Sequence, residues 1–280
     1  MGGEIPCLDA GIASIKLKAI QGEVEMNSTT KYGLHLVGKI ANIVLALVLF
    51  MVGSVRAAPD HSIFGELLSK YNQAGHVDYA GFKSEESKLD AYLAQLSSID
   101  PESLASSDRF AFYVNAYNAW TIKLILSAYP ELKSIKDLGN LFRSPWKRKI
   151  VVLNGKKVSL DHIEHDILRP QFRDPRVHFA VNCASLGCPP LFKEPFKGSR
   201  LDQQLNTATT AFINDRRYNR FDGNTLHVSK IFKWFEEDFD HDVIGFFEQF
   251  ASDELKRQIK ERRTNLKLAY LDYDWGLNGK

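Results

Sequence analysis

One segment constrains the fold more than any other: SSDRFAFYVNAYNAWTIKLILSAYP, residues 106–130. It contains no proline before its last residue, and apolar side chains would occupy almost every face of the helix it forms. A helix that is apolar nearly all round is buried rather than amphipathic. Because 44% of the chain is hydrophobic, there is enough apolar mass for a sizeable core. The segment therefore predicts a long buried helix that ends before Pro130.

The segments on either side of this helix differ in their periodicity. Before it, residues 61–75 and 85–99 carry apolar side chains at helical spacing. After it, Asn-Gly at 154–155 and Asp-Gly at 222–223 each lie between two strand-like runs, which indicates hairpins. A helix-rich first half followed by a small mixed or antiparallel sheet predicts the α+β class. By analogy, this order is compatible with a papain- or transglutaminase-like fold.

The rest of the chain is also assigned to elements. Strands are predicted at 176–182 and 266–275, and helices at 160–168, 200–215, 234–250 and 252–263. No repeat, low-complexity segment or linker interrupts this part of the sequence. We therefore expect residues 58–280 to form a single globular domain, with its core at about 105–276.

The first 57 residues have a different character. An apolar run at 40–52 follows basic residues and precedes small residues, which is the pattern of a secretory signal peptide. The run is shorter than the ~20 residues that a spanning helix needs. We expect residues 1–57 to be an extension and signal peptide removed between Ala57 and Ala58, with Met26 as an alternative start. The mature protein would be periplasmic or secreted, with no stable membrane span, and an uncleaved N-terminal anchor is the alternative.

The charge pattern argues against one class of partner, and export limits the chemistry of the cysteines. The formal net charge is +2, and no block of like charge is typical of a nucleic-acid-binding tail or a lipid-binding patch. We therefore expect no nucleic-acid partner. Export would remove Cys7 and leave Cys183 and Cys188 as the only thiols, in a compartment where disulfides persist.

These two cysteines lie in VHFAVNCASLGCPPLF, residues 177–192, and the first follows a predicted strand. On that strand His178 shares a face with Asn182 rather than with large apolar side chains. Cys183 follows at the exit of the strand, on a turn in which Gly187 can take a positive φ. Such turns can present a nucleophile rigidly, but a tight turn without chemistry has the same sequence. For His178, a histidine satisfied by one hydrogen bond is the alternative.

A straight strand makes His178 a poor base for Cys183. At ~3.3 Å of rise per residue the two would stand roughly 16 Å apart, far beyond the ~3 Å reach of a nucleophile and its base. The helix that follows Ser159 supplies remote candidates. It carries two histidine–carboxylate pairs at i,i+4 spacing, His162 with Asp166 and Asp161 with His165. A carboxylate can orient an imidazole and raise its basicity, and an ordinary solvent-facing helix is the alternative.

Two asparagines lie on one face of the buried helix, at Asn115 and Asn118. A buried carboxamide without partners costs about 1–3 kcal/mol, so both must form hydrogen bonds. They either clamp a loop or orient a catalytic histidine. His178, Cys183 and Cys188 are spaced more widely than the usual zinc-binding pairs, so we expect no metal and no cofactor.

Several stretches together resemble a family catalogued as domain of unknown function 547. They are FYVNAYNAWTIKLI, SPWKRKIVVLNGKKVSLDHIEHDILRP, DPRVHFAVNCASLGCPPL and VSKIFKWFEEDF with a closing YDW, and they cover most of residues 110–275 in order. The family occurs as exported single-domain proteins in bacteria and behind coiled-coil segments in plants. The positions that match its motifs are Asn115, Asn118, Glu164, His165, Arg169, Arg176, His178, Asn182, Cys183, Cys188 and Pro189. Because the family has no agreed activity, the resemblance implies no reaction, but it favours His165 over His162.

Two functions from different classes fit these observations. The first is a cysteine-dependent hydrolase or acyltransferase that acts outside the cytoplasm on an amide or ester of an unidentified small molecule or peptide. Its nucleophile is Cys183, its base is His165 or His178, its orienting group is Glu164 or Asn118, and its oxyanion donor is an N–H near Cys183. The surrounding cleft is assigned to Asn115, Arg176, Asn182 and Cys188. The second function is a non-catalytic exported binding or scaffold domain, in which a Cys183–Cys188 disulfide pins the turn.

Overall fold

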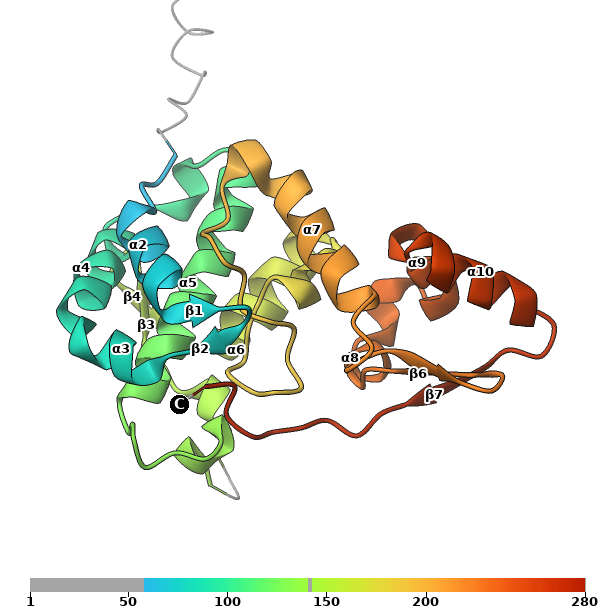
Figure 1. Ribbon diagram of the computed structural model, residues 1–280. Helices are drawn as coiled ribbons and strands as arrows, with labels where there is room; N and C mark the ends of the chain where they lie inside the picture. The colour runs from blue at the N-terminus through green and yellow to red at the C-terminus, as the bar shows by residue number, and fades with distance from the viewer. Residues whose placement is uncertain (1–57, 141–142, 280) are drawn as a thin grey trace, which may run out of the picture. The chain divides into compact units, whose positions relative to one another are not determined.

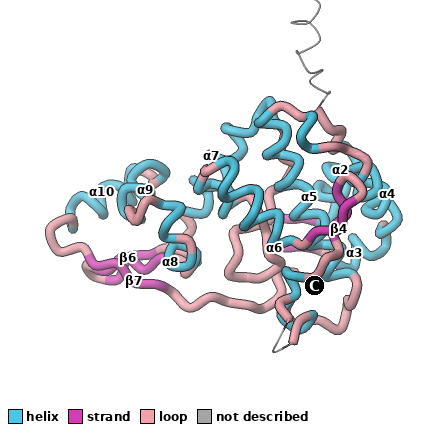
Figure 2. The backbone as a smooth tube through the Cα atoms, turned by 180° about the vertical axis from the view of Figure 1, so that it is seen from behind, coloured by secondary structure: helices cyan, strands magenta, loops and turns pink. Residues whose placement is uncertain are grey.

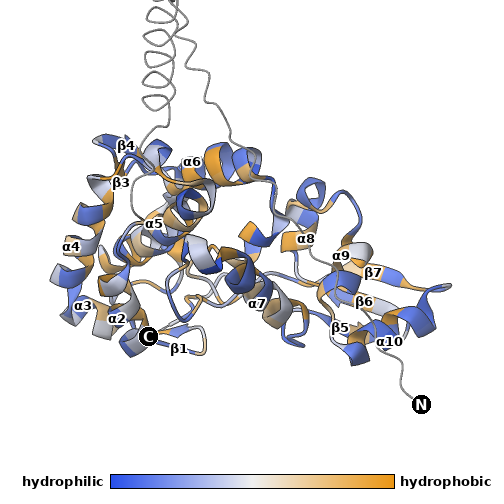
Figure 3. Ribbon diagram, turned by 90° about the horizontal axis from the view of Figure 1, so that it is seen from above, coloured by the Kyte–Doolittle hydropathy of each residue, from blue (hydrophilic) through white to orange (hydrophobic). Residues whose placement is uncertain are grey.

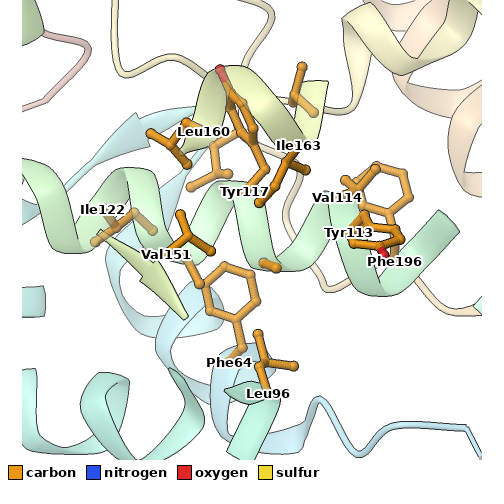
Figure 4. Close-up of a cluster of buried hydrophobic side chains, with 14 of the residues drawn as sticks. Phe64, Leu96, Tyr113, Val114, Tyr117, Ile122, Val151, Leu160, Ile163 and Phe196 are labelled. Atoms are coloured by element: carbon orange, nitrogen blue, oxygen red, sulfur yellow. The ribbon is translucent and has the colours of Figure 1, made fainter. Parts of the chain in front are cut away.

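The predicted buried helix is the centre of the N-terminal half of the fold (Figure 1). In the computed structural model, which describes residues 58–140 and 143–279, this helix is α5, Ser106–Leu126. Every residue from 110 to 119 is buried, and α5 contacts α3 (Tyr79–Ser84) and α4 (Glu86–Ser97). Figure 4 shows side chains from neighbouring elements around Tyr117 and Ile122. Since burying one such side chain contributes about 1.5–3 kcal/mol, this cluster is a main source of stability.

The segment before α4 is partly as predicted. The first helix, α2, covers Ser62–Tyr71 and ends earlier than expected, because the chain turns into a short hairpin. Strands β1 (Asn72–Gln73) and β2 (His76–Val77) pair antiparallel through a turn in which Gly75 has a φ of +83°. The predicted signal peptide, including Met26, lies outside the described residues. Within the described ranges, no helix is both long and apolar enough to cross a membrane.

The two predicted hairpins are present. The strands are β3 (Val151–Leu153), β4 (Lys156–Val158), β5 (Arg220–Asp222), β6 (Thr225–Val228) and β7 (Lys267–Tyr270). β3 pairs antiparallel with β4, and β5 with β6, while β7 lies parallel to β6 in a three-stranded sheet of order β5-β6-β7. The α+β class with small mixed and antiparallel sheets is therefore confirmed. Its likeness to papain or transglutaminase stays a prediction.

The C-terminal half contains several shorter helices around a second apolar cluster that includes Phe212, Phe232 and Phe247. They are η6 (Gly198–Arg200), α7 (Leu201–Ile213), α8 (Ile231–Trp234), η7 (Glu236–Phe239), α9 (Val243–Phe250) and α10 (Asp253–Arg262). The helix predicted at 234–250 is divided, because Asp240 and His241 adopt left-handed φ values of +53° and +56°. α10 is mainly hydrophilic (Figure 3).

The strand predicted at 176–182 is wrong. Residues Pro175–Phe179 form a 3-10 helix, η5, which starts where the Asp174 side chain accepts a hydrogen bond from the Arg176 N–H. Among the described residues, no strand pairs with the segment that follows, residues 180–182. Instead, the Asn118 side chain accepts from the Asn182 N–H at 2.8 Å and donates to the Ala180 carbonyl at 2.9 Å. A side chain from α5 therefore takes the place of a strand ladder.

The helix predicted at 160–168 is longer than expected and is mostly a π-helix. A short turn, α6 (Leu160–His162), begins at Ser159, whose hydroxyl accepts from the His162 N–H, and it continues as a π-helix, η4, over Ile163–Phe172. The predicted end at residue 168 is wrong, because the helix continues to Phe172 and Pro170 lies inside η4. The three remaining 3-10 turns are η1 (Pro101–Ser103), η2 (Ile135–Leu138) and η3 (Pro145–Lys147).

The C-terminal segment positions the candidate site. After β7 the chain returns toward the N-terminal half (Figures 1 and 2), where Gly279 forms a β-bridge with Val77 of β2. On the way, the carbonyls of Asp274 and Gly276 accept from the N–H groups of Gly187 and Leu186, both at 2.8 Å. The described residues all fall within one compact unit. The return segment thus brings aromatic side chains to the turn that carries the cysteines.

Candidate functional site

Asn182 organises the turn that carries the two cysteines. Its side-chain oxygen accepts from the Ala184 N–H at 2.9 Å and from the Asn278 side chain at 3.1 Å, and its amide donates to the Pro189 carbonyl at 2.8 Å. Ala184, not Gly187, has the positive φ, at +63°. Gly187 is needed for a different reason, since a Cβ there would lie 2.9 Å from the Asp274 nitrogen. The predicted positive φ at Gly187 is therefore wrong.

Cys183 is half-buried at the centre of a hydrogen-bonded cluster, and both cysteines are free thiols. Its Sγ lies 2.6 Å from the Cys188 Sγ, 2.9 Å from the Ser185 hydroxyl and 3.1 Å from the Tyr273 hydroxyl. Burial alone would raise the pKa of Cys183, but hydrogen bonds from Cys188, Ser185 and Tyr273 outweigh it and leave the pKa below its usual range. Burial and the contact with Cys183 hold the pKa of Cys188 well above its usual range. Of the two sulfurs, Cys183 is therefore the more readily ionised, and Cys188 is the one that keeps its proton.

Replacing Tyr273 with phenylalanine should make Cys183 less reactive. The substitution removes one hydrogen bond to the thiolate, and a bond to a charged group is worth about 1.5–3 kcal/mol, so alkylation by iodoacetamide at about pH 6 should slow about tenfold. Across a pH series, the rise in rate should move to higher pH, because the neutral thiol persists longer. Tyr270→Phe is the matched control, since Tyr270 lies on β7 and makes no bond to the thiolate. An unchanged profile in Tyr273→Phe would contradict this account of the thiol.

His178 is held by Asp238, a residue that the sequence analysis did not select. The His178 Nε2 lies 2.6 Å from the Asp238 carboxylate, and the imidazole stacks on Phe235 with ring centroids 4.1 Å apart. Arg169 donates to the same carboxylate through Nε at 2.5 Å and Nη2 at 3.1 Å. Burial alone would raise the pKa of Asp238, but hydrogen bonds from His178 and Arg169 lower it well below its usual range. The ionised carboxylate fixes the His178 proton on Nε2.

His165 has a different partner from the one predicted. Its Nδ1 lies 3.1 Å from the Arg169 Nη1, and because a guanidinium can only donate, this nitrogen must accept. His165 is therefore neutral, with its proton on Nε2. Its Nε2 lies 3.9 Å from Asp161, too far for a hydrogen bond. The other predicted pair is formed at the surface, where the His162 Nδ1 lies 2.7 Å from Asp166.

A cavity of about 150 Å³ brings five of the predicted site residues together. They are Glu164, His165, His178, Cys183 and Cys188. The rough separation of 16 Å between His178 and Cys183 assumed an extended strand, and it does not apply because η5 shortens the path of the chain. Among the described residues no histidine is hydrogen-bonded to the Cys183 sulfur, but both imidazoles line the same cavity.

The other predicted residues lie elsewhere. Asn115 bonds to both backbone groups of Phe196, accepting at 2.9 Å and donating at 2.8 Å, and Asn118 clamps the 180–182 segment. Arg176 is paired with Asp174 and with Asp202, both at 2.7 Å. None of these three side chains lines the cavity with Cys183. Of the two predicted roles, Asn115 and Asn118 therefore have the one in which their side chains hold a loop through backbone hydrogen bonds.

Replacing Asn118 with alanine should destabilise the fold. It would leave the buried Ala180 carbonyl and Asn182 N–H without partners, and two such losses cost about 2–4 kcal/mol. Urea denaturation in the presence of reductant measures the loss. Asn265→Ala, at an exposed position after α10, is the control and should change the free energy of unfolding by less than about 0.5 kcal/mol. Equal stabilities for the two variants would contradict the clamp.

The sequence patterns did not reveal several residues of the site. Asp238 and the aromatic residues Trp146, Trp234, Phe235, Tyr273 and Trp275 were not selected, although all belong to stretches that carry the family resemblance. The family resemblance could have pointed to these residues, whereas no regular spacing in the sequence does. Within residues 58–140 and 143–279, no cluster of His, Cys, Asp and Glu side chains is arranged to hold a metal ion.

Comparison with known proteins gives one match. Residues 101–213 match the family described as "Protein of unknown function, DUF547". The matched region includes α5, the π-helix η4, the cysteine turn and α7. It ends before Asp238 and Tyr273. No curated protein and no solved structure matches the chain.

Proposed function

The chain belongs to this family of unknown function through residues 101–213, and from that premise we propose that it is a cysteine-dependent hydrolase or acyltransferase. One observation carries the proposal. Cys183 and His178 line the same cavity, and the His178 Nε2 is hydrogen-bonded to the ionised Asp238 carboxylate at 2.6 Å. A nucleophile, an imidazole and a carboxylate that orients the imidazole make up the triad used for covalent acyl transfer. The three residues span 60 positions of the sequence and come from separate segments, the cysteine turn, η5 and η7.

Each member of the triad has one role. With the His178 proton fixed on Nε2, its Nδ1 keeps a lone pair that can take a proton. Cys183 supplies the attacking sulfur, and its lowered pKa favours the thiolate. Asp238 holds the imidazole and stabilises its protonated form. His165, neutral and on the same cavity, is the second candidate for the base.

The reaction follows from these roles. The proton of the Cys183 thiol passes to His178, and the sulfur attacks the carbonyl carbon of an amide or ester to give a tetrahedral intermediate. The bond between carbon and the leaving nitrogen or oxygen then breaks, and His178 returns the proton to the leaving group. A thioester on Cys183 remains. Water or an acceptor amine attacks the thioester, gives up one proton and regenerates the thiol.

The oxyanion donor in this proposal is the Tyr273 hydroxyl. Two backbone N–H groups at the start of the turn have other acceptors, since the Cys183 N–H donates to the Cys188 sulfur and the Ala184 N–H to Asn182. Tyr273 lies 3.1 Å from the Cys183 sulfur. Burial, and then the nearby thiols, hold the pKa of Tyr273 well above its usual range, so the hydroxyl keeps its proton. It can therefore donate to the oxygen of a tetrahedral intermediate.

Trapping of the acyl-enzyme tests the proposal. The full chain is incubated under reducing conditions with p-nitrophenyl acetate, an activated ester, and the release of p-nitrophenol and the intact mass are followed. We expect a burst of p-nitrophenol equal to the amount of enzyme and an acetyl group on Cys183. Peptide mapping must place the adduct on Cys183. An enzyme that releases no burst and gains no acetyl group would refute the function.

A second function is favoured by the distance of 2.6 Å between the two sulfurs. With so little separation, an external disulfide such as oxidised glutathione can oxidise the pair and be reduced to two thiols. The result would be a non-catalytic exported domain with a structural Cys183–Cys188 bridge. This function predicts a melting temperature that falls on reduction and no acyl-enzyme in either redox state. The first function predicts acylation of the reduced form only.

We also propose that the protein acts outside the cytoplasm, in the periplasm or after secretion. The support is the sequence of residues 1–57, with its short apolar run and its small residues before Ala58. The intact mass of protein recovered from outside the cytoplasm tests it. A chain that begins at Ala58 is expected, and a full-length chain retained in the membrane would indicate the anchor instead.

A further inference from the structure

The cavity beside Cys183 has a wall of aromatic rings from three separate segments. Trp146 comes from η3, Trp234 from α8, and Tyr273 and Trp275 from the C-terminal return segment. The centroid of Trp275 lies 4.5 Å from that of Tyr273, 5.7 Å from that of Trp234 and 5.8 Å from that of Trp146. Phe235 also lines the cavity. Three of the four tryptophans of the chain therefore surround one small space.

The charges on this cavity have one sign. Glu164 lines it, while no lysine or arginine is among its lining residues in the described part of the chain. Burial first, and then the charge of Glu164, raise the pKa of Tyr117 well above its usual range, which is consistent with a carboxylate close to that phenol. The Cys183 sulfur adds further negative character. Aromatic faces and a carboxylate around one space favour a cation.

We propose that the cavity binds the organic ammonium group of the substrate, held between the tryptophan rings and Glu164. The inference rests on the proposed function and deepens it, because the ammonium compound would be the amine that leaves the acyl group or accepts it. A cavity of about 150 Å³ suits a head group of this size, since an apolar cavity of that volume in another protein holds benzene. Ammonium groups over tryptophan faces gain about 0.5–2 kcal/mol each when partly desolvated.

A neutral apolar group would fill the same space less well. It would cover Glu164 without giving the carboxylate a counter-charge, and burying a charge without one is costly. Lys136, which is exposed, already places its ammonium 3.5 Å from the centroid of the Trp275 ring. This indole thus accepts a cation on its face. Lys136 itself does not line the cavity.

A matched pair of ligands tests the proposal. Choline and its uncharged isostere 3,3-dimethyl-1-butanol have nearly the same shape, so their affinities differ through charge. Binding is measured by tryptophan fluorescence and calorimetry in Cys183→Ala, which lacks the proposed nucleophile and reports on binding to the cavity. We expect choline to bind at least about tenfold more tightly than the alcohol, the sum of a cation–π contact and a carboxylate contact. Equal affinity, or no binding of choline, would overturn the proposal.

Two substitutions test which residues produce the preference for choline over the alcohol. Glu164→Gln should bring the affinity ratio close to one, whereas Glu236→Gln, a matched change on η7 outside the cavity, should leave it intact. Trp234→Leu should weaken choline binding, since this side chain lines the cavity and is 44% exposed, so its loss removes a ring without opening the core. A preference that survives Glu164→Gln would overturn the assignment. If that variant does not fold, the ratio measured in Cys183→Ala alone still decides the proposal. Because these measurements use a variant that cannot be acylated, their outcome is independent of whether the acyl-enzyme forms.

Discussion

Replacing Cys183 with serine is expected to lower the burst rate of p-nitrophenol release by about 10³-fold or more, because a triad without its nucleophile loses nearly all covalent catalysis. Serine keeps the size and the hydrogen-bonding capacity of the side chain, so the turn held by Asn182 should fold as before. A neutral hydroxyl is much less acidic than the thiol and is not poised as an anion by Ser185, Cys188 and Tyr273. The measurement is the pre-steady-state release of p-nitrophenol with the intact mass of the enzyme.

Cys188→Ser is the matched control for this prediction. Cys188 faces the same turn and donates to Cys183, but its own pKa is raised, so it stays a thiol. Its replacement keeps a donor beside the nucleophile and should retain the burst within about tenfold. If Cys188→Ser abolished acylation and Cys183→Ser did not, Cys188 would be the nucleophile and the assignment of roles would be wrong.

Replacing Asp238 with asparagine is expected to lower the rate of acylation by about 10²–10⁴-fold. The amide has nearly the shape of the carboxylate, but it can donate to the His178 Nε2 and so shift the proton to Nδ1, where the imidazole no longer has a lone pair to offer the thiol. The change also removes the charge that pairs with Arg169. The burst rate and the melting temperature should be measured together, so that a loss of folding is not read as a loss of chemistry.

Asp240→Asn serves as the control, with the same change of charge two residues away. Asp240 is exposed in a left-handed conformation that asparagine tolerates, and it makes no contact with His178. We expect its burst rate to stay within about twofold of the unsubstituted enzyme. A folded Asp238→Asn protein as fast as this control would show that His178 needs no carboxylate, and His165 would then be the base to test.

The local signals in the sequence were enough for the main elements of the fold. Residues 106–126 are apolar on almost every face and form the buried α5, and the Asn-Gly pair at 154–155 forms the hairpin between β3 and β4. Local patterns failed where tertiary contacts replace them. Residues 176–182 have the alternation of a strand. Instead of a strand, η5 forms, and the Asn118 side chain makes hydrogen bonds to the backbone groups of Ala180 and Asn182.

The candidate site was predictable only in part, for the same physical reason. Cys183, His178, His165 and Glu164 are residue types that suggest chemistry by themselves, and they line one cavity. Asp238 lies 60 positions after His178 and Tyr273 lies 90 positions after Cys183. Asp238 contacts His178 from η7, and Tyr273 contacts Cys183 because the C-terminal segment returns to the cysteine turn. No pattern of spacing encodes either contact. The pairing of His165 with Asp161 was predicted from an α-helix, and the π-helical turn alters that geometry.

The state of the Cys183 thiol tests the central claim most directly. Protein purified from outside the cytoplasm is treated briefly with iodoacetamide at about pH 6, with and without prior reduction, and the labelled residue is identified by intact mass and peptide mapping. We predict that Cys183 is labelled without reduction, faster than an ordinary cysteine at that pH, and that Cys188 is not. Labelling of both residues only after reduction would contradict an activated nucleophile and would identify the pair as a structural disulfide.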